Sequence, residues 1–490
     1  MSKKIYRLHP ISAVITSVKA LKNMILPVAI IIITNGFNFS FNFRSPYFIE
    51  TILLFGVWGG AAVLALIAGV VKWRTFVYWF ENGELHIRYG LFVKKKRYIP
   101  FERIQSLNYH EGIFHRLFRL VKVQVETAGS KNGKPEAELT AIPKSQADAI
   151  ELEMQRAKIK ENNISELESI VTPAEKTIAP VIYRMSIRDL VVLATTSGGI
   201  GVVLSGLLAV VSQFSDIIPF DKLFHELGNF VKVGIFLMAL TVMFGLMLAW
   251  LFSVAITIVN YYEYTVRIED EKLIITKGLL ERKRITLPLN RIQGVRIVEN
   301  PLRQLTGFAT VFVESAGGNG ENSADKKIAL FPLIRRKECF EVLVGLFPDV
   351  NWEPHLIRSP KRARAFFYRI DFVWLLPMIG VCIYFFYPYG LLSLLFIPIS
   401  LLLGVWQYKT AGYSLDDKRL IMQYRIISRF TFFMEKKRIQ SLQSSQTYFQ
   451  KRENVMSVKA TVMSGMTGTT GNVQSIEKQD VEKIFAWYEH

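Results

Sequence analysis

The apolar segments limit the fold of this chain more than any other feature, because they come in three pairs. The paired runs cover residues 20–37 and 48–71, 190–214 and 233–259, and 372–387 and 391–406. Both runs of the second pair lack charged residues, and a helix of about 20 apolar residues is long enough to cross a bilayer core. The third pair is shorter and joined by a tight Pro-Tyr-Gly turn, so it forms a thin, tilted or re-entrant hairpin. The sequence therefore predicts three pairs of transmembrane helices.

Composition agrees with a membrane protein. Half of the 490 residues are hydrophobic, and the mean hydropathy of +0.25 is above that of a typical soluble domain. Lysine and arginine outnumber the acids by 60 to 41, a net charge of +19 that favours anionic partners. The two cysteines, Cys339 and Cys382, lie far apart, so we expect a reducing compartment and no disulfide framework.

The distribution of basic residues predicts the orientation of the helices. The short connections within the pairs contain only two basic residues, Arg44 and Lys222, and the long segments contain nearly all the others. Basic loops stay on the inner face of the membrane, so the long segments and both termini are predicted to be cytoplasmic. The basic start, MSKKIYRLHP, is not followed by an evident small-residue cleavage site, which favours a retained membrane segment over a signal peptide.

One short pattern recurs three times, each time after a pair of apolar runs. It reads Arg-Ile-Gln-Ser-Leu from Arg103 and from Arg438, and Arg-Ile-Gln-Gly-Val from Arg291. The neighbouring residues align without gaps: a leucine lies 18 residues before each arginine, and Glu126 and Glu314 each lie 23 residues after theirs. A membrane hairpin followed by a cytoplasmic domain is therefore predicted to occur three times.

Each unit has a strand-like pattern followed by a helical one. Apolar and polar residues alternate on both sides of a glycine, Gly90 in the first unit and Gly278 in the second, as in a β-hairpin or meander. Residues 144–161 and 476–487 then show the spacing of an amphipathic helix. We expect an α+β membrane protein in which each of three helix pairs is followed by a cytoplasmic β-domain with a terminal helix.

These patterns divide the chain into eight segments. In order, the segments are a basic start with the first hairpin, the first β-domain, a linker, the second hairpin, the second β-domain, a linker, the third hairpin and a divergent third β-domain. Their expected limits are residues 1–71, 72–162, 163–189, 190–259, 260–350, 351–371, 372–406 and 407–490.

The repeated unit resembles the bacterial pleckstrin-homology-like (PH-like) membrane domain. The resemblance rests on the basic strand before the Arg-Ile-Gln signature, a turn such as ENPLRQLTGFATVFV, and the strand ending in ESAGG. The whole chain is similar to the YdbT-like family of multi-pass membrane proteins, which carry this domain several times between pairs of membrane helices. The third copy departs most, since Glu435 replaces Pro100 and Pro288, and Thr461 replaces the glutamate.

The resemblance implies a fold, a location and partners. The fold is a PH-like domain of antiparallel strands with a terminal helix, and the location is the bacterial cytoplasmic membrane. The implied role is tolerance of envelope stress or resistance to membrane-active peptides. The implied partners are membrane lipids, anionic ones among them, and either a small membrane protein with a single PH-like domain or a second copy. No nucleic-acid partner is expected, because the basic residues lack an interleaved aromatic pattern.

Basic residues ahead of each signature are candidate sites for lipid or for a protein partner. Each juxtamembrane lysine or arginine contributes about 1 kcal/mol of attraction to an anionic leaflet. A solvated basic face that only fixes the topology explains them equally well. The candidates are Lys94, Lys95, Lys96, Arg97, Arg282, Lys283, Arg284 and Arg429.

The signature itself is expected to be mainly structural. Alternate residues of a strand face opposite ways, so its isoleucine points into the domain while the flanking arginine and glutamine face outward or bond to a neighbouring strand. A ligand site there is the alternative. The signature residues are Arg103, Gln105, Arg291, Gln293, Arg438 and Gln440.

No catalytic, metal-binding or cofactor-binding pattern is evident in the sequence. The seven histidines lack zinc-motif spacing, and no glycine-rich phosphate loop with its lysine is present. The apolar segments hold no central charged residue of the kind that ion-coupled transporters use. We therefore expect a non-enzymatic interaction or scaffold protein. A sensor of anionic lipid headgroups is the first alternative, and a transporter component is the second.

Overall fold

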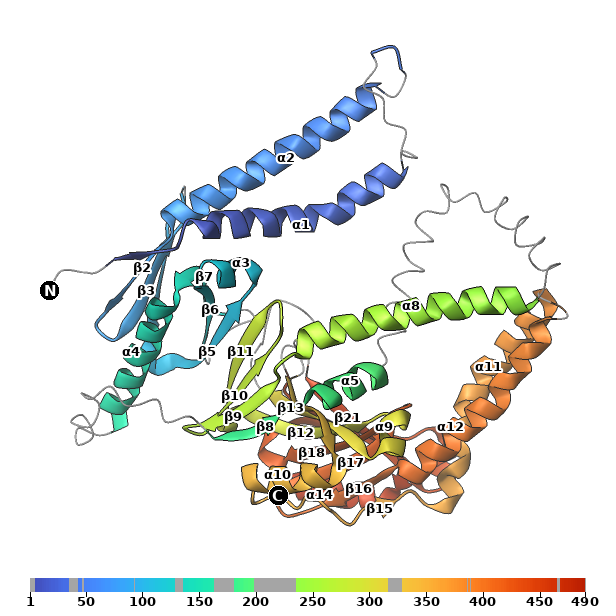
Figure 1. Cartoon of the computed structure of the whole chain (residues 1–490). Coiled ribbons are helices and arrows are strands. Elements are labelled where there is room, and N and C mark those ends of the chain that lie inside the picture. The colour runs from blue at the N-terminus through green and yellow to red at the C-terminus, as the bar shows by residue number, and fades with distance from the viewer. Residues whose placement is uncertain are drawn as a thin grey trace. The chain divides into compact units, whose positions relative to one another are not determined.

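The computed structural model describes most of the chain. The described residues are 5–34, 43–45, 48–91, 93–127, 135–162, 180–197, 235–315, 328–385, 387, 389–464 and 468–489. They contain three repeats of one arrangement: a short strand, helices, a three-stranded meander, a turn of 3-10 helix, three more strands and a terminal helix (Figure 1).

The first repeat runs from β1 to α4. Its first part comprises β1 (Tyr6–Arg7), α1 (Ile11–Thr34), α2 (Phe48–Thr75), β2 (Val77–Glu81), β3 (Glu84–Tyr89) and β4 (Lys95–Pro100). Its second part comprises the 3-10 turn η1 (Phe101–Arg103), β5 (Ile104–Glu111), α3 (Ile113–Leu117), β6 (Leu120–Thr127), β7 (Ala137–Pro143) and α4 (Lys144–Asn162).

The second repeat has the same order. Its first part comprises β8 (Val181–Arg184), α5 (Ile187–Thr196), α8 (Ile235–Tyr261), β9 (Thr265–Glu269), β10 (Lys272–Lys277) and β11 (Arg282–Pro288). Its second part comprises η4 (Leu289–Arg291), β12 (Ile292–Glu299), α9 (Pro301–Thr306), β13 (Phe308–Ser315), β14 (Ile328–Arg335) and α10 (Arg336–Leu346).

The third repeat completes the described chain. Its first part comprises β15 (Ile357–Arg358), η6 (Lys361–Ala365), α11 (Phe366–Phe385), η7 (Tyr389–Leu395), α12 (Phe396–Thr410), β16 (Gly412–Leu415), β17 (Arg419–Arg425) and β18 (Arg429–Glu435). Its second part comprises η8 (Lys436–Arg438), β19 (Ile439–Ser445), α13 (Tyr448–Arg452), β20 (Val455–Val462), β21 (Thr469–Glu477) and α14 (Lys478–Glu489).

Each repeat begins with a strand that precedes its helices. β1, β8 and β15 pair antiparallel with β2, β9 and β16, the first strands after the helices. These opening strands have only two to four residues, too few for an alternating pattern, so the sequence analysis does not identify them. The first sheet of each repeat therefore combines a strand that precedes the helices in the sequence with strands that follow them.

Strand pairing crosses from each repeat to the next. β1 to β4 form a four-stranded sheet and β19 to β21 form a three-stranded one. Between them lie two seven-stranded sheets, in the orders β7-β6-β5-β11-β10-β9-β8 and β14-β13-β12-β18-β17-β16-β15. The junctions are the antiparallel pairs β5 with β11 and β12 with β18. Each seven-stranded sheet thus joins the last three strands of one repeat to the first four of the next.

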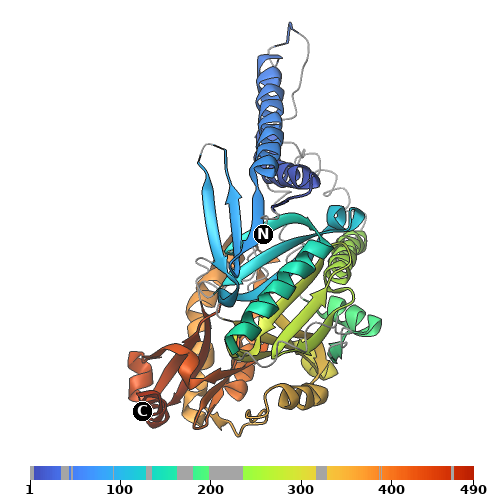
Figure 2. The same ribbon diagram turned by 90° about the vertical axis from the view of Figure 1, so that its left-hand side faces the viewer.

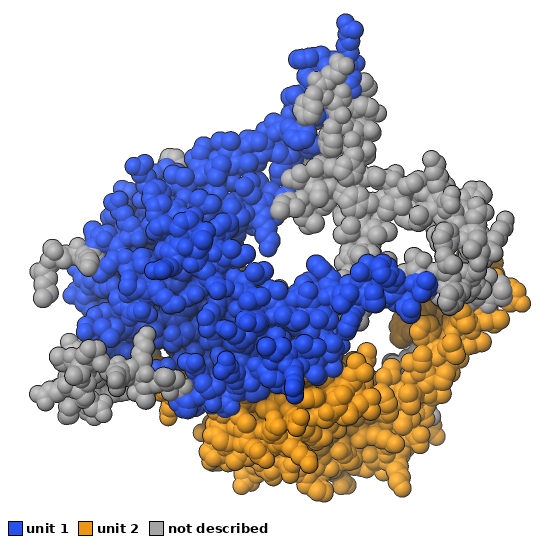
Figure 3. All heavy atoms as spheres, in the orientation of Figure 1, with its two compact units in different colours: residues 1–128, 136–269, 273–286 blue, residues 129–135, 270–272, 287–490 orange. Residues whose placement is uncertain are grey.

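The chain divides into two compact units (Figure 3). The first contains residues 1–128, 136–269 and 273–286, and the second contains residues 129–135, 270–272 and 287–490. The β5–β11 junction lies in the first unit and the β12–β18 junction in the second.

Apolar cores lie between the two groups of strands in the first and third repeats. The first core includes the fully buried Leu85, Val123 and Leu139, and it is closed by Ile150 of α4, which lies along the strands of this unit (Figure 2). The third core has a similar set: Leu420, Phe432, Val458, Val473 and Ile484. Burial of each large aliphatic side chain stabilises the fold by about 1.5–3 kcal/mol.

The Arg-Ile-Gln signature lies at a corner between the two groups of strands. Its arginine ends a 3-10 turn and its isoleucine, Ile104, Ile292 or Ile439, begins the next strand. All three isoleucines are buried. The strand register shifts at the following glutamine in each copy, which is typical of a β-bulge. The repeated pattern therefore coincides with a repeated bend of the backbone.

Gly90 and Gly278 lie in the turns that lead into β4 and β11. Both have a φ of +105°, where residues with side chains are strained. A Cβ atom at Gly90 would collide with the carbonyl oxygen of Val93, and one at Gly278 with that of Glu281. The turn geometry therefore requires the two glycines that the repeat spacing aligns.

Four helical segments in the described part of the chain are long and apolar enough to cross a membrane: Thr51–Thr75, Met243–Tyr261, Lys361–Phe385 and Gly390–Thr410. They coincide with the second run of the first and second pairs and with both runs of the third. Residues 20–34 of the first run of the first pair lie in α1, which is not among the four, and residues 35–37 lie outside the described residues. Most of the first run of the second pair, residues 198–214, lies outside the described residues. The expected α+β class with three repeats is confirmed.

Candidate interaction surfaces

The basic residues ahead of the signature lie at equivalent strands, β4, β11 and β18, the fourth strand of each repeat. Lys94, Arg282 and Arg429 each lie nine residues before the signature arginine. The three strands have different neighbours. β5 borders β11 and β12 borders β18, whereas within the described residues β4 pairs with β3 alone.

On β4 the basic side chains face solvent. Lys94, Lys95 and Lys96 are exposed, and in the described part of the chain none of them forms an ion pair. Arg97 is also exposed but lies 3.6 Å from a carboxylate oxygen of Glu136 and donates to its carbonyl oxygen. In Figure 2 the hairpin of β3 and β4 stands at the side of its sheet. The three lysines therefore form an open basic edge.

On β11 the equivalent residues face β5. Arg282 lies opposite Glu111, and Arg284 lies opposite Tyr109 in the strand register. The Arg284 guanidinium lies 5.4 Å from the centre of the Tyr109 ring and 3.5 Å from a carboxylate oxygen of Glu151. Burial raises the pKa of the Tyr109 phenol. Here the basic side chains contribute to the contact between two repeats.

Two further contacts hold the first junction. Lys283 lies opposite His110, and the Nδ1 atom of His110 lies 3.6 Å from Oε1 of Glu281. The imidazole is the main cause that lowers the pKa of Glu281 to about 2. The backbone N–H of Thr286 donates to Oδ1 of Asn108 on β5, at 3.0 Å. This junction is therefore held by side chains as well as by strand pairing.

On β18 the equivalent residue, Arg429, forms an ion pair. Nε and Nη2 of Arg429 donate to the two carboxylate oxygens of Glu299, at 2.7 and 2.6 Å. Arg336 adds a contact of 3.9 Å to the same carboxylate. Two parallel charge-assisted hydrogen bonds are among the stronger polar interactions in proteins. Arg429, a candidate ligand site from sequence, is thus part of the second junction.

The second junction also contains a buried charge pair. Glu314 is fully buried, and its Oε1 atom lies 2.8 Å from Nη2 of Arg296. The hydroxyls of Ser464 and Thr469, from the third repeat, donate to its other oxygen. A buried carboxylate needs such partners because its desolvation is costly. Glu314 therefore connects the second repeat to the third.

The aligned glutamate of the first repeat has two neutral hydrogen-bond donors among its contacts. Glu126 accepts hydrogen bonds from the Ser106 hydroxyl and the Asn108 side-chain amide, both at 2.9 Å. In the third repeat the hydroxyls of Thr461 and Thr470 lie 2.9 Å apart at this position. The sequence analysis aligned these positions without assigning them a role. An acid at the same offset in two apolar strands is the signal that could have identified them.

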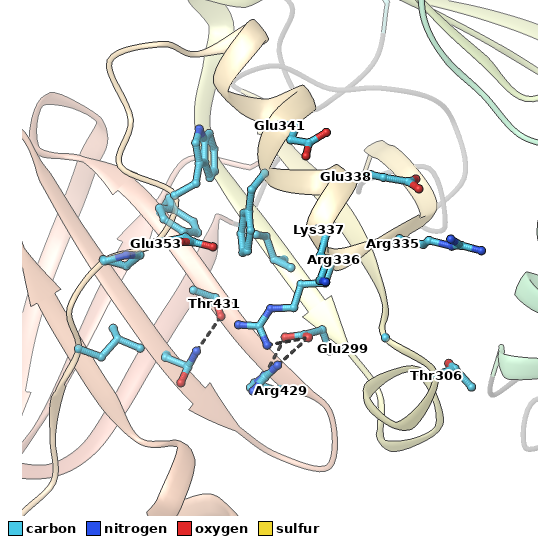
Figure 4. Close-up of a pocket in the computed structure, with 18 of the residues that line it drawn as sticks. Glu299, Thr306, Arg335, Arg336, Lys337, Glu338, Glu341, Glu353, Arg429 and Thr431 are labelled. Atoms are coloured by element: carbon cyan, nitrogen blue, oxygen red, sulfur yellow. Dashed lines mark hydrogen bonds and ion pairs between the residues drawn. The ribbon is translucent and has the colours of Figure 1, made fainter.

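An open groove of ≈ 1270 Å³ lies beside the Arg429–Glu299 pair in the second unit, where Arg336 also points toward Glu299 (Figure 4). Trp352, Phe340 and Phe433 supply apolar lining. Burial lowers the pKa of Arg358, another lining residue, and the Arg429 guanidinium acts in the same direction. The charged lining residues are Glu299, Arg335, Arg336, Lys337, Glu338, Glu341, Glu353, Arg358 and Arg429. Basic and acidic groups are nearly balanced, so the groove does not favour an anion.

The signature residues have different surroundings in the three copies. Nη2 of Arg438 donates to the backbone oxygen of Asn290 in η4, at 2.8 Å. The Gln293 amide donates to the backbone oxygen of Arg291, at 3.1 Å. Arg103 and Gln440 are exposed, and Gln105 is half-buried. These contacts stabilise the corners of the chain.

The described residues show few groups suited to metal binding or nucleophilic catalysis. Within them no three histidine, cysteine, aspartate or glutamate side chains are grouped so that they could hold a metal ion. The thiol of Cys339 is buried, which raises its pKa to about 12 and keeps it protonated.

The architecture defines a class of protein: a membrane protein in which apolar helices alternate with tandem, helix-capped β-domains. The model of the bacterial PH domain family matches residues 22–158, 223–346 and 342–490, once for each repeat. The chain belongs to the bacterial PH domain family.

Two relatives from Bacillus subtilis (strain 168) extend this result. The chain is 34% identical to the UPF0699 transmembrane protein YdbT over 495 residues, which cover 99% of this chain and 98% of the relative. It is 28% identical to the UPF0699 transmembrane protein YdbS over 101 residues, which cover 20% of this chain and 63% of the relative. The resemblance to the YdbT-like family is confirmed. Together with four helices of membrane length, these matches identify a multi-pass membrane protein.

Proposed function

We propose that this protein is a non-enzymatic interaction protein of the bacterial cytoplasmic membrane, whose PH-like domains lie on the cytoplasmic side and bind a smaller PH-like membrane protein. The observation that carries this proposal is the pair of seven-stranded sheets, in which successive PH-like repeats join edge to edge. A domain that pairs with its neighbour twice within one chain has a surface suited to pairing with a similar domain of another chain.

The similarity to YdbS supports a partner of this kind. The matched 101 residues are 63% of YdbS, so a protein much shorter than this chain shares part of its sequence. Such a protein has room for one PH-like unit and would present the same strand edges.

Purification of the full-length protein in mild detergent tests the proposal. Mass spectrometry of the co-eluting proteins should find a small PH-like membrane protein in stoichiometric amount. If the protein elutes repeatedly without any such partner from its native membrane, the proposed function is wrong.

The cytoplasmic placement is tested separately with Lys95→Cys, since Lys95 is exposed on β4. A membrane-impermeant maleimide should label this cysteine in inverted vesicles and not in intact spheroplasts. Cys339 is buried, and the unsubstituted protein corrects for any labelling of Cys382. Labelling in intact spheroplasts would reverse the proposed orientation.

Headgroup sensing is the second candidate function, favoured by the three exposed lysines Lys94, Lys95 and Lys96. The triple alanine variant should then retain less anionic lipid through purification, and the triple arginine variant should retain as much as the wild type. If the lysines do not bind headgroups, the alanine variant keeps as much lipid as the wild type.

We place the physiological role, by resemblance, in tolerance of envelope stress or of membrane-active peptides. A deletion strain should become more sensitive to such peptides, and restoring the gene should reverse the change. Equal growth of the two strains across peptide concentrations would contradict this role.

A further inference from the structure

We infer that β4 is a docking edge for the PH-like domain of a separate protein. The three strands of that domain that are equivalent to β5, β6 and β7 would extend the β1–β4 sheet. This inference rests on the proposed function and assigns its binding surface. It also predicts which strand of the partner makes the contact, namely the one that follows the corner corresponding to the Arg-Ile-Gln signature.

Positional equivalence is the first argument. β4, β11 and β18 are each the fourth strand of their repeat, and β11 and β18 each pair with the fifth strand of the preceding repeat, β5 or β12. No repeat precedes β4 in the described chain, so its sheet stops at four strands where the two others reach seven. A strand from another chain that is equivalent to β5 or β12, the fifth strand of its repeat, would complete the same arrangement.

The composition of β4 does not prevent pairing. Lysine and proline commonly protect an edge strand from association, and β4 contains both, with Pro100 at its end. However, β11 aligns with β4 and has Lys283 and Pro288 at the equivalent positions of Lys95 and Pro100. Since β11 is paired along its first half, basic residues and a terminal proline are compatible with an occupied edge.

The backbone of β4 points a donor outward. Tyr98 is equivalent to Thr286, whose N–H is directed at Asn108 of the neighbouring β5. The N–H of Tyr98 is therefore expected to face away from β3 and toward the open edge. The Tyr98 side chain is 54% exposed, so this position lies where an added strand would run.

Charge complementarity indicates which kind of strand binds to β4. In both internal junctions the basic residue at the start of the fourth strand faces an acid: Arg282 lies opposite Glu111, and Arg429 binds Glu299. Each acid lies seven residues after the signature isoleucine. The equivalent residue of the first repeat is Lys94, directly before β4, so the added strand should carry an aspartate or glutamate opposite it.

A second copy of this chain does not meet that requirement. β5 and β12 are already paired within the chain, so the fifth strand that a second copy could offer is β19. The residue seven positions after Ile439 of β19 is the neutral Gln446. β19 is also polar and largely exposed along its second half, at Gln443, Ser444 and Ser445. The lysines of β4 would therefore lack a counter-charge in a head-to-tail dimer. A distinct PH-like protein with the acid is the better match.

Site-specific photo-cross-linking in the native membrane tests the inference on the full-length chain. Tyr98 is replaced by p-benzoylphenylalanine, and the same substitution at Val344, an exposed residue of α10, serves as the control. We expect a cross-link from position 98 alone. Peptide mapping should place it in the partner strand that follows the signature corner, with an acidic residue seven positions after the signature isoleucine or its equivalent.

Charge reversal provides the second measurement. Lys94→Glu, Lys95→Glu and Lys96→Glu together should reduce this cross-link on the order of tenfold or more, because close charge pairs across an interface are worth more than 1.4 kcal/mol. The triple arginine variant should leave it unchanged. All three lysines are exposed, so neither variant disturbs the core.

The outcomes separate the inference from the proposed function. If the small partner co-purifies but cross-links only at Val344 or remains bound to the triple glutamate variant, β4 is not the docking edge and the interaction function stands. A cross-link from position 98 to β19 of a second copy overturns the inference in favour of self-association. If no PH-like partner co-purifies and position 98 cross-links to nothing, both are wrong.

Discussion

The two junctions between repeats share one topology and differ in chemistry. At β5–β11 the side chains that meet are partly exposed, as in the contact between His110 and Glu281. At β12–β18 one charge pair is buried: Arg296 pairs with Glu314 where almost no water reaches. Strand pairing therefore sets how repeats join, and the side chains set how strongly each junction resists opening.

The largest expected effect comes from breaking the buried pair. Glu314→Ala should destabilise the second unit by about 3–5 kcal/mol, because the Arg296 guanidinium would remain buried without its partner. The aligned change in the first unit, Glu126→Ala, removes the acceptor of the neutral Ser106 and Asn108 groups and should cost about 1–3 kcal/mol. Amide hydrogen exchange of β12 and β5 in detergent measures the two effects separately.

A double variant serves as the control for this prediction. Arg296→Met with Glu314→Leu removes both charges and should recover most of the stability that Glu314→Ala loses. Equal losses for Glu314→Ala and Glu126→Ala would show that the two junctions do not differ in the way described above.

A smaller effect is expected at the arginine that begins the fourth strand. Arg429→Ala should cost about 1.5–3 kcal/mol, since it removes two charge-assisted hydrogen bonds to Glu299. Arg282→Ala should change stability by less than about 0.5 kcal/mol, because its side chain is half-exposed and lies 3.9 Å from Glu263. Chemical unfolding of the two variants provides the comparison, and a larger loss for Arg282→Ala would reverse it.

The smallest expected effect depends on pH and concerns the first junction alone. The pKa of Glu281 is lowered from 4.5 to about 2, so its contribution to stability is fully present above pH 4.5 and is lost as the pH falls toward 2. The difference in unfolding midpoint between wild type and Glu281→Gln should therefore shrink between pH 5 and pH 3. The carboxylate is half-exposed, so added salt should shrink it as well.

Two variants test the cause of this pH dependence. His110→Ala removes the main group that lowers the pKa of Glu281, and it should weaken the pH dependence. For comparison, the difference in unfolding midpoint between wild type and Glu299→Gln, in the second junction, is measured at the same pH values. If wild type and Glu281→Gln differ equally at pH 5 and pH 3, the contact with His110 does not stabilise the first junction.

Much of the fold was predictable because its signals are local. Apolar runs identify membrane-length helices, and a fixed spacing of leucine, glycine and signature residues identifies the three repeats. Gly90 and Gly278 are explained by a backbone turn that only glycine adopts without strain. The opening strands were missed, because two to four residues carry no periodic pattern.

The candidate site was predictable only in part. The basic residues are evident from the sequence, and their equivalence follows from the repeat alignment. Their surroundings are not evident, since the carboxylate that binds Arg429 lies 130 residues away in the chain. The same uncertainty applies to Glu314, whose hydroxyl partners come from the next repeat.

The sequence by itself determined four membrane-length helices and the number of repeats, because hydropathy and spacing act over short stretches of chain. The tertiary structure determined which strand edges meet. Alternation of apolar and polar residues specifies which face of a strand is buried and leaves its edge partner open. For this reason β4, β11 and β18 share a pattern, yet two of them lie inside seven-stranded sheets and one remains at an edge.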